Sequence, residues 1–320
     1  MTESYYNTFF SLLKANRAKA FKYMESKTPL FLYKYIDDEI FKTNISSFLQ
    51  GNILANSPRK FHCTNDLFDC NPLMSKTPAD TYFYTENFRQ TLLETYKNNG
   101  VQIPTWLHLN DWQSAFKEYI TEYETSLSPK TKEDSWSLIN KIISHHIDDI
   151  RILLCNYLFD EVKISCFTLC KDNLPMWTHY ANQHKGVCIE YETSRITNNF
   201  FRRVLFPVNY TTNMINPFRI FLENHSIEEF IISSCITKHY TWKYEDEWRF
   251  VICPSCNKSF EYWHGKTEDI LFNFVKPTRV IFGVYAEDEF IKYVSPICKQ
   301  YGVEVNKATT TSCGIDFCKF

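Results

Sequence analysis

The sequence predicts an α+β fold with a central mixed or antiparallel sheet and a helical insertion. Short segments rich in aromatic and β-branched residues, which suit strands, occur before residue 77 and again after residue 162. Between them, residues 77–158 repeat apolar side chains every three to four positions, as amphipathic helices do. We therefore expect an N-terminal helix over 1–28 and a single α+β domain over 29–320, with the insertion at about 77–158.

Composition places the chain among globular proteins and limits its partners. Of its 320 residues 44% are hydrophobic, which is enough for a large core. The net charge of −2 gives no overall attraction to nucleic acid, although a local basic patch is compatible with it. No apolar run reaches the roughly 18 residues that span a bilayer, and the first residues lack a signal-peptide pattern. We expect a cytoplasmic protein without membrane contacts, whose 12 cysteines are mostly reduced.

Each expected element follows from a local pattern. Periodicity over 4–26 predicts one helix that packs on the protein, with a membrane-surface helix as the alternative. Residues 30–35 suit an aromatic strand, the following helix ends at Gly51, and the next strand ends near residues 61–63. The other helices are expected near 86–98, 111–125, 134–158, 215–237 and 286–300. The other strands are expected at 162–169, 186–192, 203–210, 246–253, 278–284 and 302–305.

The segment 165–192 concentrates polar and aromatic side chains around one short helix. At 100° per residue, one broad face of this helix is shared by Met176, Trp177, Tyr180, Ala181 and His184. His179 lies at the edge of that face, where it can be presented to a cleft in one tautomer. A core histidine that donates to a backbone carbonyl is the alternative interpretation.

The segment 242–249 is the second candidate site. Strand alternation places Trp248, Phe250 and Ile252 on one face and Glu247, Arg249 and Val251 on the other. Glu247 and Arg249, bordered by Trp242, suit a ligand with a polar edge and a phosphate or carboxylate. An ordinary cross-strand ion pair is the alternative interpretation.

A metal site is a weaker prediction. Cys235 and His239 stand four residues apart on an expected helix, and Cys253 and Cys256 form a CxxC pair, which together are an acceptable zinc ligand set. An expected strand interrupts this set and cysteines are scattered along the chain, so we expect unligated thiols and no metal. The sequence also lacks GxGxxG, Walker, HExxH, GxSxG and kinase motifs, which argues against the enzyme classes that carry them.

Several segments closely resemble domain-of-unknown-function family 2971, a mostly bacterial family. The resemblance covers about residues 30–307 and rests above all on the MWTHYA segment at 176–181 and the YEDEWR segment at 244–249. The family's FNDPFD-like loop is matched by residues 67–72, which retain Asp69 but displace the Asn and Pro.

A looser resemblance to ADP-ribosyltransferases implies an activity. These enzymes place a His or Arg on an early aromatic-flanked strand, then a loop near the nicotinamide, then a Glu at the start of a late strand. Lys34 or Tyr35, Asp69 and Glu247 follow in that order, although Lys34 replaces the usual His or Arg and the Ser-Thr-Ser motif is missing. The resemblance implies that Glu247 hydrogen-bonds the ribose of NAD and stabilises an oxocarbenium-like transition state as nicotinamide leaves.

The leading hypothesis is therefore a NAD-consuming ADP-ribosyltransferase-like enzyme or NAD glycohydrolase, and the family resemblance implies a toxin or phage-defence effector. The predicted catalytic residues are Glu247 and His179. A small nucleotide is the expected ligand, and the residues predicted to bind it are Tyr33, Lys34, Tyr35, Asp69, Trp177, Tyr180, Trp242 and Arg249. Two alternatives stay open: a non-catalytic module that senses a nucleotide or peptide, and a hydrolase in which His179 and Glu190 or Glu247 form an acid–base pair.

Overall fold

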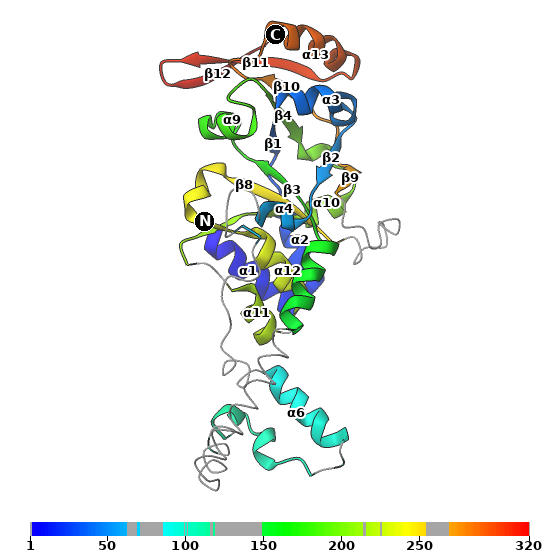
Figure 1. Ribbon diagram of the computed structural model, residues 1–320, viewed down its shortest axis with the longest axis vertical. Coiled ribbons are helices and arrows are strands. Elements are labelled where there is room, and N and C mark those ends of the chain that lie inside the picture. The colour runs from blue at the N-terminus through cyan, green and yellow to red at the C-terminus, as the bar shows by residue number, and fades with distance from the viewer. Residues whose placement is uncertain are drawn as a thin grey trace. The chain divides into compact units, whose positions relative to one another are not determined.

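The chain is an α+β protein that divides into two compact units in a computed structural model (Figure 1), and all described strands belong to the first unit. The first unit comprises residues 1–71, 159–214 and 234–320, and the second comprises residues 72–158 and 215–233. The predicted α+β class is confirmed. The residues that the structure describes are 2–62, 69–70, 86–98, 100, 102–115, 118, 149–213, 216–224, 226–253 and 269–319.

An eight-stranded mixed sheet is the centre of the first unit. Its strand order is β12-β11-β10-β4-β1-β3-β8-β5, and β10 and β11 are parallel while the other neighbours are antiparallel. The strands are β1 (Phe31–Ile36), β3 (Lys163–Thr168), β4 (Val187–Glu192), β5 (Leu205–Pro207), β8 (Glu247–Ile252), β10 (Arg279–Phe282), β11 (Glu304–Thr311) and β12 (Gly314–Lys319). Two smaller pairs join β2 (Asn52–Ala55) to β9 (Ile270–Asn273), and β6 (Asn209–Thr211) to β7 (Thr237–His239).

Helices of both units are short to medium in length. The first unit contains α1 (Thr2–Ala15), α2 (Arg17–Lys27), α3 (Asp38–Leu49), α4 (Pro58–His62), α9 (Leu174–Tyr180), α10 (Asn199–Arg203), α13 (Asp288–Gln300) and the 3-10 helices η2 (Thr193–Arg195) and η3 (Tyr240–Glu245). The second contains α6 (Glu86–Asn98), η1 (Thr105–His108), α11 (Pro217–Asn224) and most of α12 (Ile227–Ile236). Residues 149–161 are also helical. None of the helices among the described residues has the length and apolar character needed to cross a bilayer.

Alternation along the strands separates two clusters of buried side chains on the two faces of the sheet in the described part of the first unit. The larger cluster gathers one face of the sheet, with Leu32 of β1 and Ile189 of β4, against Phe41 of α3 and Phe290 of α13. The smaller cluster gathers the opposite side chains of the same strands against α9, and its buried members are Tyr33, Tyr35, Met176, Trp177, Ala181, Cys188, Ile281 and Ala308. Because successive strand side chains point to opposite faces, β1 contributes to both clusters.

Two predicted helices are each two helices in the structure. The single helix expected over 4–26 is wrong, because Asn16 leaves the helical conformation with φ −162° and caps α2 by accepting from the backbone N–H of Lys19 at 3.0 Å. The helix expected near 215–237 is divided into α11 and α12 in the same way, and its last residue belongs to β7. Periodicity over 4–26 does not reveal the first break, because Phe9 and Leu13 of α1 and Ala20 and Met24 of α2 fall in one helical phase. Residues 229–238 are buried without interruption, so α12 shows no periodicity from which its limits could be predicted.

Three predicted strands also differ from the structure. The strand expected after Gly51 is present as β2, but it ends at Ala55 and not near 61–63, because residues 58–62 form α4; residue 63 lies outside the described residues. The strand expected over 203–210 is replaced by the end of α10, by β5 and by β6, with Pro207 ending β5 at the edge of the sheet. The strand expected at 302–305 continues as β11 into a hairpin with β12. Most of the segments expected to be helical at 111–125 and 134–158 lies outside the described residues.

Two close contacts hold parts of the first unit that are distant in sequence: Gly283 against the loop after α9, and Ser57 against Phe159. Gly283 lies against the loop after α9, where a Cβ atom would come within 2.0 Å of the carbonyl oxygen of His184. The backbone N–H of Gly283 also donates to the carbonyl of Gly186 at 2.9 Å. Elsewhere in the unit, the hydroxyl of Ser57 donates to the carbonyl of Phe159 at 2.6 Å, at the point where the chain re-enters the first unit.

Gly283→Ala tests the first of these contacts. We expect the added methyl group to lower the free energy of unfolding by about 1–3 kcal/mol, because the backbone of His184 must move to admit it. Urea denaturation measures this change, and Lys299→Ala at an exposed position of α13 is the control, with an expected change within about 0.5 kcal/mol. Equal stability of the two variants would contradict the close approach.

Candidate functional site

The sheet opens between β1 and β3. Strand β1 pairs with β4 from Phe31↔Glu192 to Ile36↔Val187, but it pairs with β3 at Tyr33↔Thr168 alone. The ammonium of Lys34 reaches across the opening and donates to the carbonyl of Cys166 at 2.8 Å and to the hydroxyl of Ser165 at 3.3 Å. A side chain thus replaces the ladder hydrogen bonds that two adjacent strands would otherwise form.

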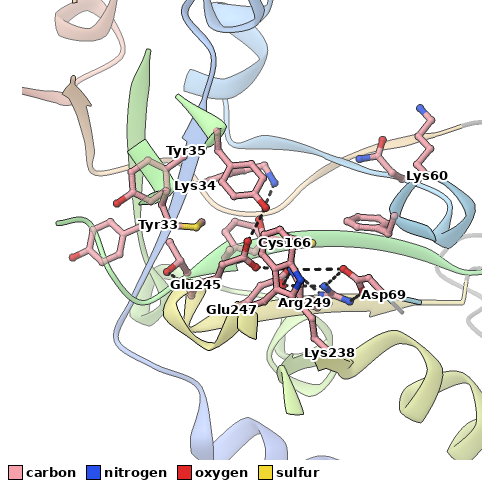
Figure 2. A pocket seen from close by; sticks show the side chains of 17 residues that line it. Tyr33, Lys34, Tyr35, Lys60, Asp69, Cys166, Lys238, Glu245, Glu247 and Arg249 are labelled. Carbon is pink, nitrogen blue, oxygen red and sulfur yellow. Dashed lines mark hydrogen bonds and ion pairs between the residues drawn. The ribbon is translucent and has the colours of Figure 1, made fainter. Parts of the chain in front are cut away.

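A cavity of about 300 Å³ lies at this opening (Figure 2). It receives side chains from β1, β3, α4, α9, β7, η3 and β8, all of which belong to the first unit. Its aromatic walls are Tyr33, Tyr35, Phe61, Phe167, Tyr180 and Trp242. Its charged lining residues are Lys34, Lys60, Asp69, Lys238, Glu245, Glu247 and Arg249.

Arg249 is the most completely bound side chain of the cavity wall, and it is fully buried. Its Nη1 and Nη2 donate to the two carboxylate oxygens of Asp69 at 2.7 and 2.8 Å. Its Nε and Nη2 donate to the two oxygens of Glu247, both at 2.9 Å, and Nη1 also donates to the carbonyl of Cys235 at 2.7 Å. These contacts occupy all five N–H donors of the guanidinium, so Arg249 joins β8, α12 and the segment at Asp69.

Lys238 supplies the second buried cation. Its ammonium lies 2.5 Å from Oε2 of Glu245, 3.2 Å from Oε2 of Glu247 and 3.6 Å from Oδ2 of Asp69. Three carboxylates therefore share two cations, which leaves one negative charge in excess when all three are ionised. Figure 2 shows Glu245 and Glu247 side by side above Lys238.

The pKa values of the two glutamates of this cluster are shifted in opposite directions. Burial alone raises the pKa of Glu247, but the charges of Arg249 and Lys238 outweigh it and hold that pKa well below the ordinary value. For Glu245, burial and the charge of Glu247 raise the pKa in spite of the opposing effect of Lys238. The surrounding charges thus favour the ionised form of Glu247, whereas Glu245 takes up a proton at a higher pH than an ordinary glutamate.

Glu245 is a site residue that sequence reasoning missed. The hydroxyl of Tyr180 donates to its Oε1 at 2.7 Å, which joins α9 to the charged cluster. Asp246, between the two glutamates, is left-handed with φ 43°, so the chain turns and both glutamates line the same cavity. The local sequence gives no sign of this turn, because the strand expected at 246–253 begins with Asp246 as an ordinary strand residue.

Lys238 was missed for a different reason. It lies in the three-residue strand β7, between Cys235 and His239, which the sequence placed together on an expected helix. Burial lowers its pKa, but Glu247 and Asp69 outweigh burial, and the net effect is a raised pKa that keeps the ammonium charged.

Lys34 is the cation of the cavity without a carboxylate partner among the residues that the structure describes. Burial lowers the pKa of its ammonium, which Cys166 and Glu247 oppose only in part. Lys60, by contrast, is paired with Asp269 and is largely exposed.

Most of the predicted ligand residues meet at this cavity. The predicted residues that line it are Tyr33, Lys34, Tyr35, Asp69, Tyr180, Trp242, Glu247 and Arg249. Trp177 lies behind the wall: it is fully buried, packs edge-on against Tyr35 and donates to the carbonyl of Lys171 at 2.9 Å. His179 is exposed on α9 and does not line the cavity.

Burial confirms the predicted face of β8, because Trp248, Phe250 and Ile252 lie in the larger core cluster. The predicted face of α9 is confirmed only for Met176 and Trp177: Tyr180 is exposed, and the helix ends there, so Ala181 and His184 follow it in the next turn. Glu190, the partner considered for His179, instead pairs with Arg279 at 3.1 Å.

The proposed zinc ligands are not arranged as predicted. Cys235 lies at the end of α12 but His239 follows in β7, so the two do not share a helix. The Nδ1 atom of His239 lies 2.9 Å from the hydroxyl of Thr241. No group of three or more His, Cys, Asp or Glu side chains suited to a metal occurs in the described part of the chain, and Cys256 lies outside it.

The fold and the site define an α+β protein with a buried five-residue ionic cluster lining a cavity at an opening in its sheet. Residues 176–250 match the family model "Protein of unknown function (DUF2971)", so the predicted resemblance of the MWTHYA and YEDEWR segments to this family is borne out over this part of the chain. The match begins on α9 and ends on β8, so it includes Tyr180, Lys238, Glu245 and Glu247. No curated protein and no solved structure matches the chain.

Arg249→Met tests the ionic cluster. Removing the guanidinium leaves Asp69 and Glu247 buried with one fewer cation, so we expect a loss of about 3–5 kcal/mol in the free energy of unfolding at neutral pH. Arg195→Met, at an exposed ion pair with Glu192, is the control and should cost less than about 1 kcal/mol.

The same variant has a predicted pH dependence. In the wild type the pKa of Glu247 is lowered, so its contribution to stability is present above the ordinary glutamate pKa of about 4.3 and is lost as the pH falls below it. In Arg249→Met, protonation of the unpaired buried carboxylates stabilises the folded state instead. The difference in the free energy of unfolding between wild type and variant should therefore narrow from pH 7 toward pH 4. A deficit that stays constant over this range would argue against charge as its cause.

Proposed function

We propose that the chain is a NAD-consuming enzyme that transfers the ADP-ribosyl group to an acceptor or to water. The observation that carries this proposal is the charge arrangement of the cavity. Lys34, a cation without a carboxylate partner among the described residues, lies on one wall, and the carboxylates of Glu245 and Glu247 lie on another. Lys34 is half-buried, and a cation partly withdrawn from water gains from an anionic partner, so Lys34 favours a ligand that brings an anion.

NAD has a group that suits each kind of side chain lining the cavity, which are the cation Lys34, the aromatic rings and the carboxylates. Its diphosphate supplies an anion for Lys34, and its planar nicotinamide ring suits the faces of Tyr33, Tyr35, Tyr180 or Trp242. A volume of about 300 Å³ is at the small end of ligand pockets, which suits the nicotinamide–ribose half better than the whole dinucleotide.

The chemistry requires an anion rather than an acid. As the C1′–N bond of NAD breaks, its electron pair goes to the pyridinium ring and nicotinamide leaves neutral, while positive charge develops on the ribose. The excess negative charge of the cluster stabilises this oxocarbenium-like transition state. A hydroxyl group or water then forms the new bond to C1′ and releases its proton, which Glu245 can accept because its pKa is raised.

Release of nicotinamide tests the proposal directly. We expect the full chain, incubated with NAD alone or with cell extract as a source of acceptors, to release nicotinamide. Glu245→Gln should reduce the rate by about 10²–10³, as loss of one electrostatic contact to a transition state does. Lys292→Gln on the exposed surface of α13 should retain the wild-type rate. Absence of nicotinamide and of labelled product under all these conditions would overturn the proposal.

Lys34 provides a test of ligand binding that does not depend on turnover. Only the protonated amine attracts an anion, so the affinity for ADP-ribose should be constant at low pH and fall as the pH rises toward the lowered pKa of Lys34. We expect this decline below the ordinary lysine pKa of about 10.4, and expect Lys34→Gln to abolish it. Calorimetric titration across the pH range measures both effects, and an identical decline in Lys34→Gln would exclude Lys34 as its source.

A non-catalytic nucleotide-sensing module is the second candidate, and one observation favours it. Both oxygens of Glu247 and all five donors of Arg249 are already bound within the protein, as expected of a cluster that maintains a shape. If ADP-ribose raises the Tm of the chain and Glu245→Gln keeps both that shift and the biological activity, the sensing module is the better description.

The remaining hypothesis from sequence receives no such support. A His179 acid–base pair would require this exposed side chain at a carboxylate, and Glu190 pairs with Arg279 instead. The phage-defence role and the cytoplasmic location stay proposals that rest on the family resemblance and on the sequence alone.

A further inference from the structure

The helical hairpin of α1 and α2 carries an excess of positive charge that the rest of the chain does not share. Residues 14–27 contain one acid, Glu25, and five cations, which are Lys14, Arg17, Lys19, Lys22 and Lys27. Their net charge is therefore +4 in a chain whose total is −2, so the remaining residues sum to −6. Such segregation of charge indicates a local anion-binding surface in a protein that is acidic as a whole.

The structure exposes this charge to solvent. All five cationic side chains are exposed, and Glu25 is already paired with Arg203 of α10 at 3.2 Å. Among the described residues, Lys19 and Lys22 form no ion pair. At 100° per residue they lie on the side of α2 opposite the buried Ala20 and Met24.

The apolar side of the hairpin is covered by the protein itself. Phe9, Leu13, Ala20 and Met24 are buried, and the ring of Phe9 packs edge-on against Phe206 of β5 at 5.5 Å. No large apolar side chain between residues 5 and 27 is exposed. A helix that lies on a bilayer needs an apolar face to insert, so this surface suits a hydrated polyanion better than a membrane.

We propose that the exposed face of the α1–α2 hairpin binds the phosphate backbone of a nucleic acid without reading its sequence. Lysine and arginine side chains neutralise phosphates, whereas base recognition relies on side chains such as Asn and Gln. Asn16 is the one amide of residues 14–27, and it is engaged in capping α2. From Arg17 to Lys27 the helix rises about 15 Å, a length that covers several phosphates of a duplex.

This surface is separate from the proposed enzymatic site. None of the five cations lines the cavity, and the proposal holds whether or not the chain consumes NAD. Binding at this surface would place the protein on nucleic acid through an interaction that the cavity does not provide.

Fluorescence anisotropy of labelled single-stranded and duplex DNA with the full chain tests the proposal. We expect binding at about 50 mM salt that weakens linearly on logarithmic axes, with a slope no steeper than about −4.5 for five phosphate contacts. The triple variant Lys19→Gln, Lys22→Gln, Lys27→Gln should lose at least about tenfold in affinity and a corresponding part of that slope. Its Tm and its nicotinamide release should equal those of the wild type.

The matched control is a triple variant at exposed lysines outside the hairpin, Lys292→Gln, Lys299→Gln and Lys319→Gln. This variant removes the same number of positive charges as the hairpin variant. Its affinity for DNA should nevertheless change less than twofold if the location of the charges matters. Equal losses in the two triple variants, or no binding by the wild type, would overturn the proposal. So would tighter binding to phosphatidylserine vesicles than to DNA, since the surface would then be a membrane contact.

Discussion

The bidentate contacts of Arg249 are the constraint on which the rest of the first unit depends. A fully buried guanidinium is stable only when its donors are all occupied, and here Asp69, Glu247 and the carbonyl of Cys235 occupy them. Asp69 is 180 residues from Arg249 in the sequence, whereas Cys235 and Glu247 are 14 and 2 residues away. The position of Arg249 on β8 therefore determines where α12 ends and where the segment at Asp69 must lie.

The cavity follows from the same constraint. Because Glu247 is held by Arg249, it cannot turn away, and Lys238 gathers Glu245 onto the same wall. Tyr180 then connects this wall to α9, whose other side chains pack beneath Tyr35. The opening between β1 and β3 is bridged by Lys34 rather than closed by a ladder, which leaves room for a ligand beside the charges. Strands β7 and β8 thus carry charges of the ionic cluster, and together with β1 and β3 they also line the cavity beside it.

The faces of regular elements could be predicted from sequence, whereas their interruptions could not. The alternation of β8 and the period of α9 correctly separated Trp248 and Trp177 from the polar side chains, because burial follows helical and strand geometry directly. Glu245 escaped notice because the left-handed Asp246 breaks the strand pattern at the site itself. The partnership of Asp69 with Arg249 spans 180 residues, and no local pattern reports a contact of that range. His179 illustrates the opposite error, in which a conspicuous residue type drew attention to an exposed position.

The anchoring of Asp69 and of Phe159 has a consequence for how such chains can diverge. Arg249 holds the chain where it leaves the first unit, and Ser57 holds it where it returns. Both contacts are made by partners outside the segment between them, so the two ends of that segment are held within the first unit by residues of that unit. We therefore expect an insertion in that segment to leave the cavity wall at Asp69 in place.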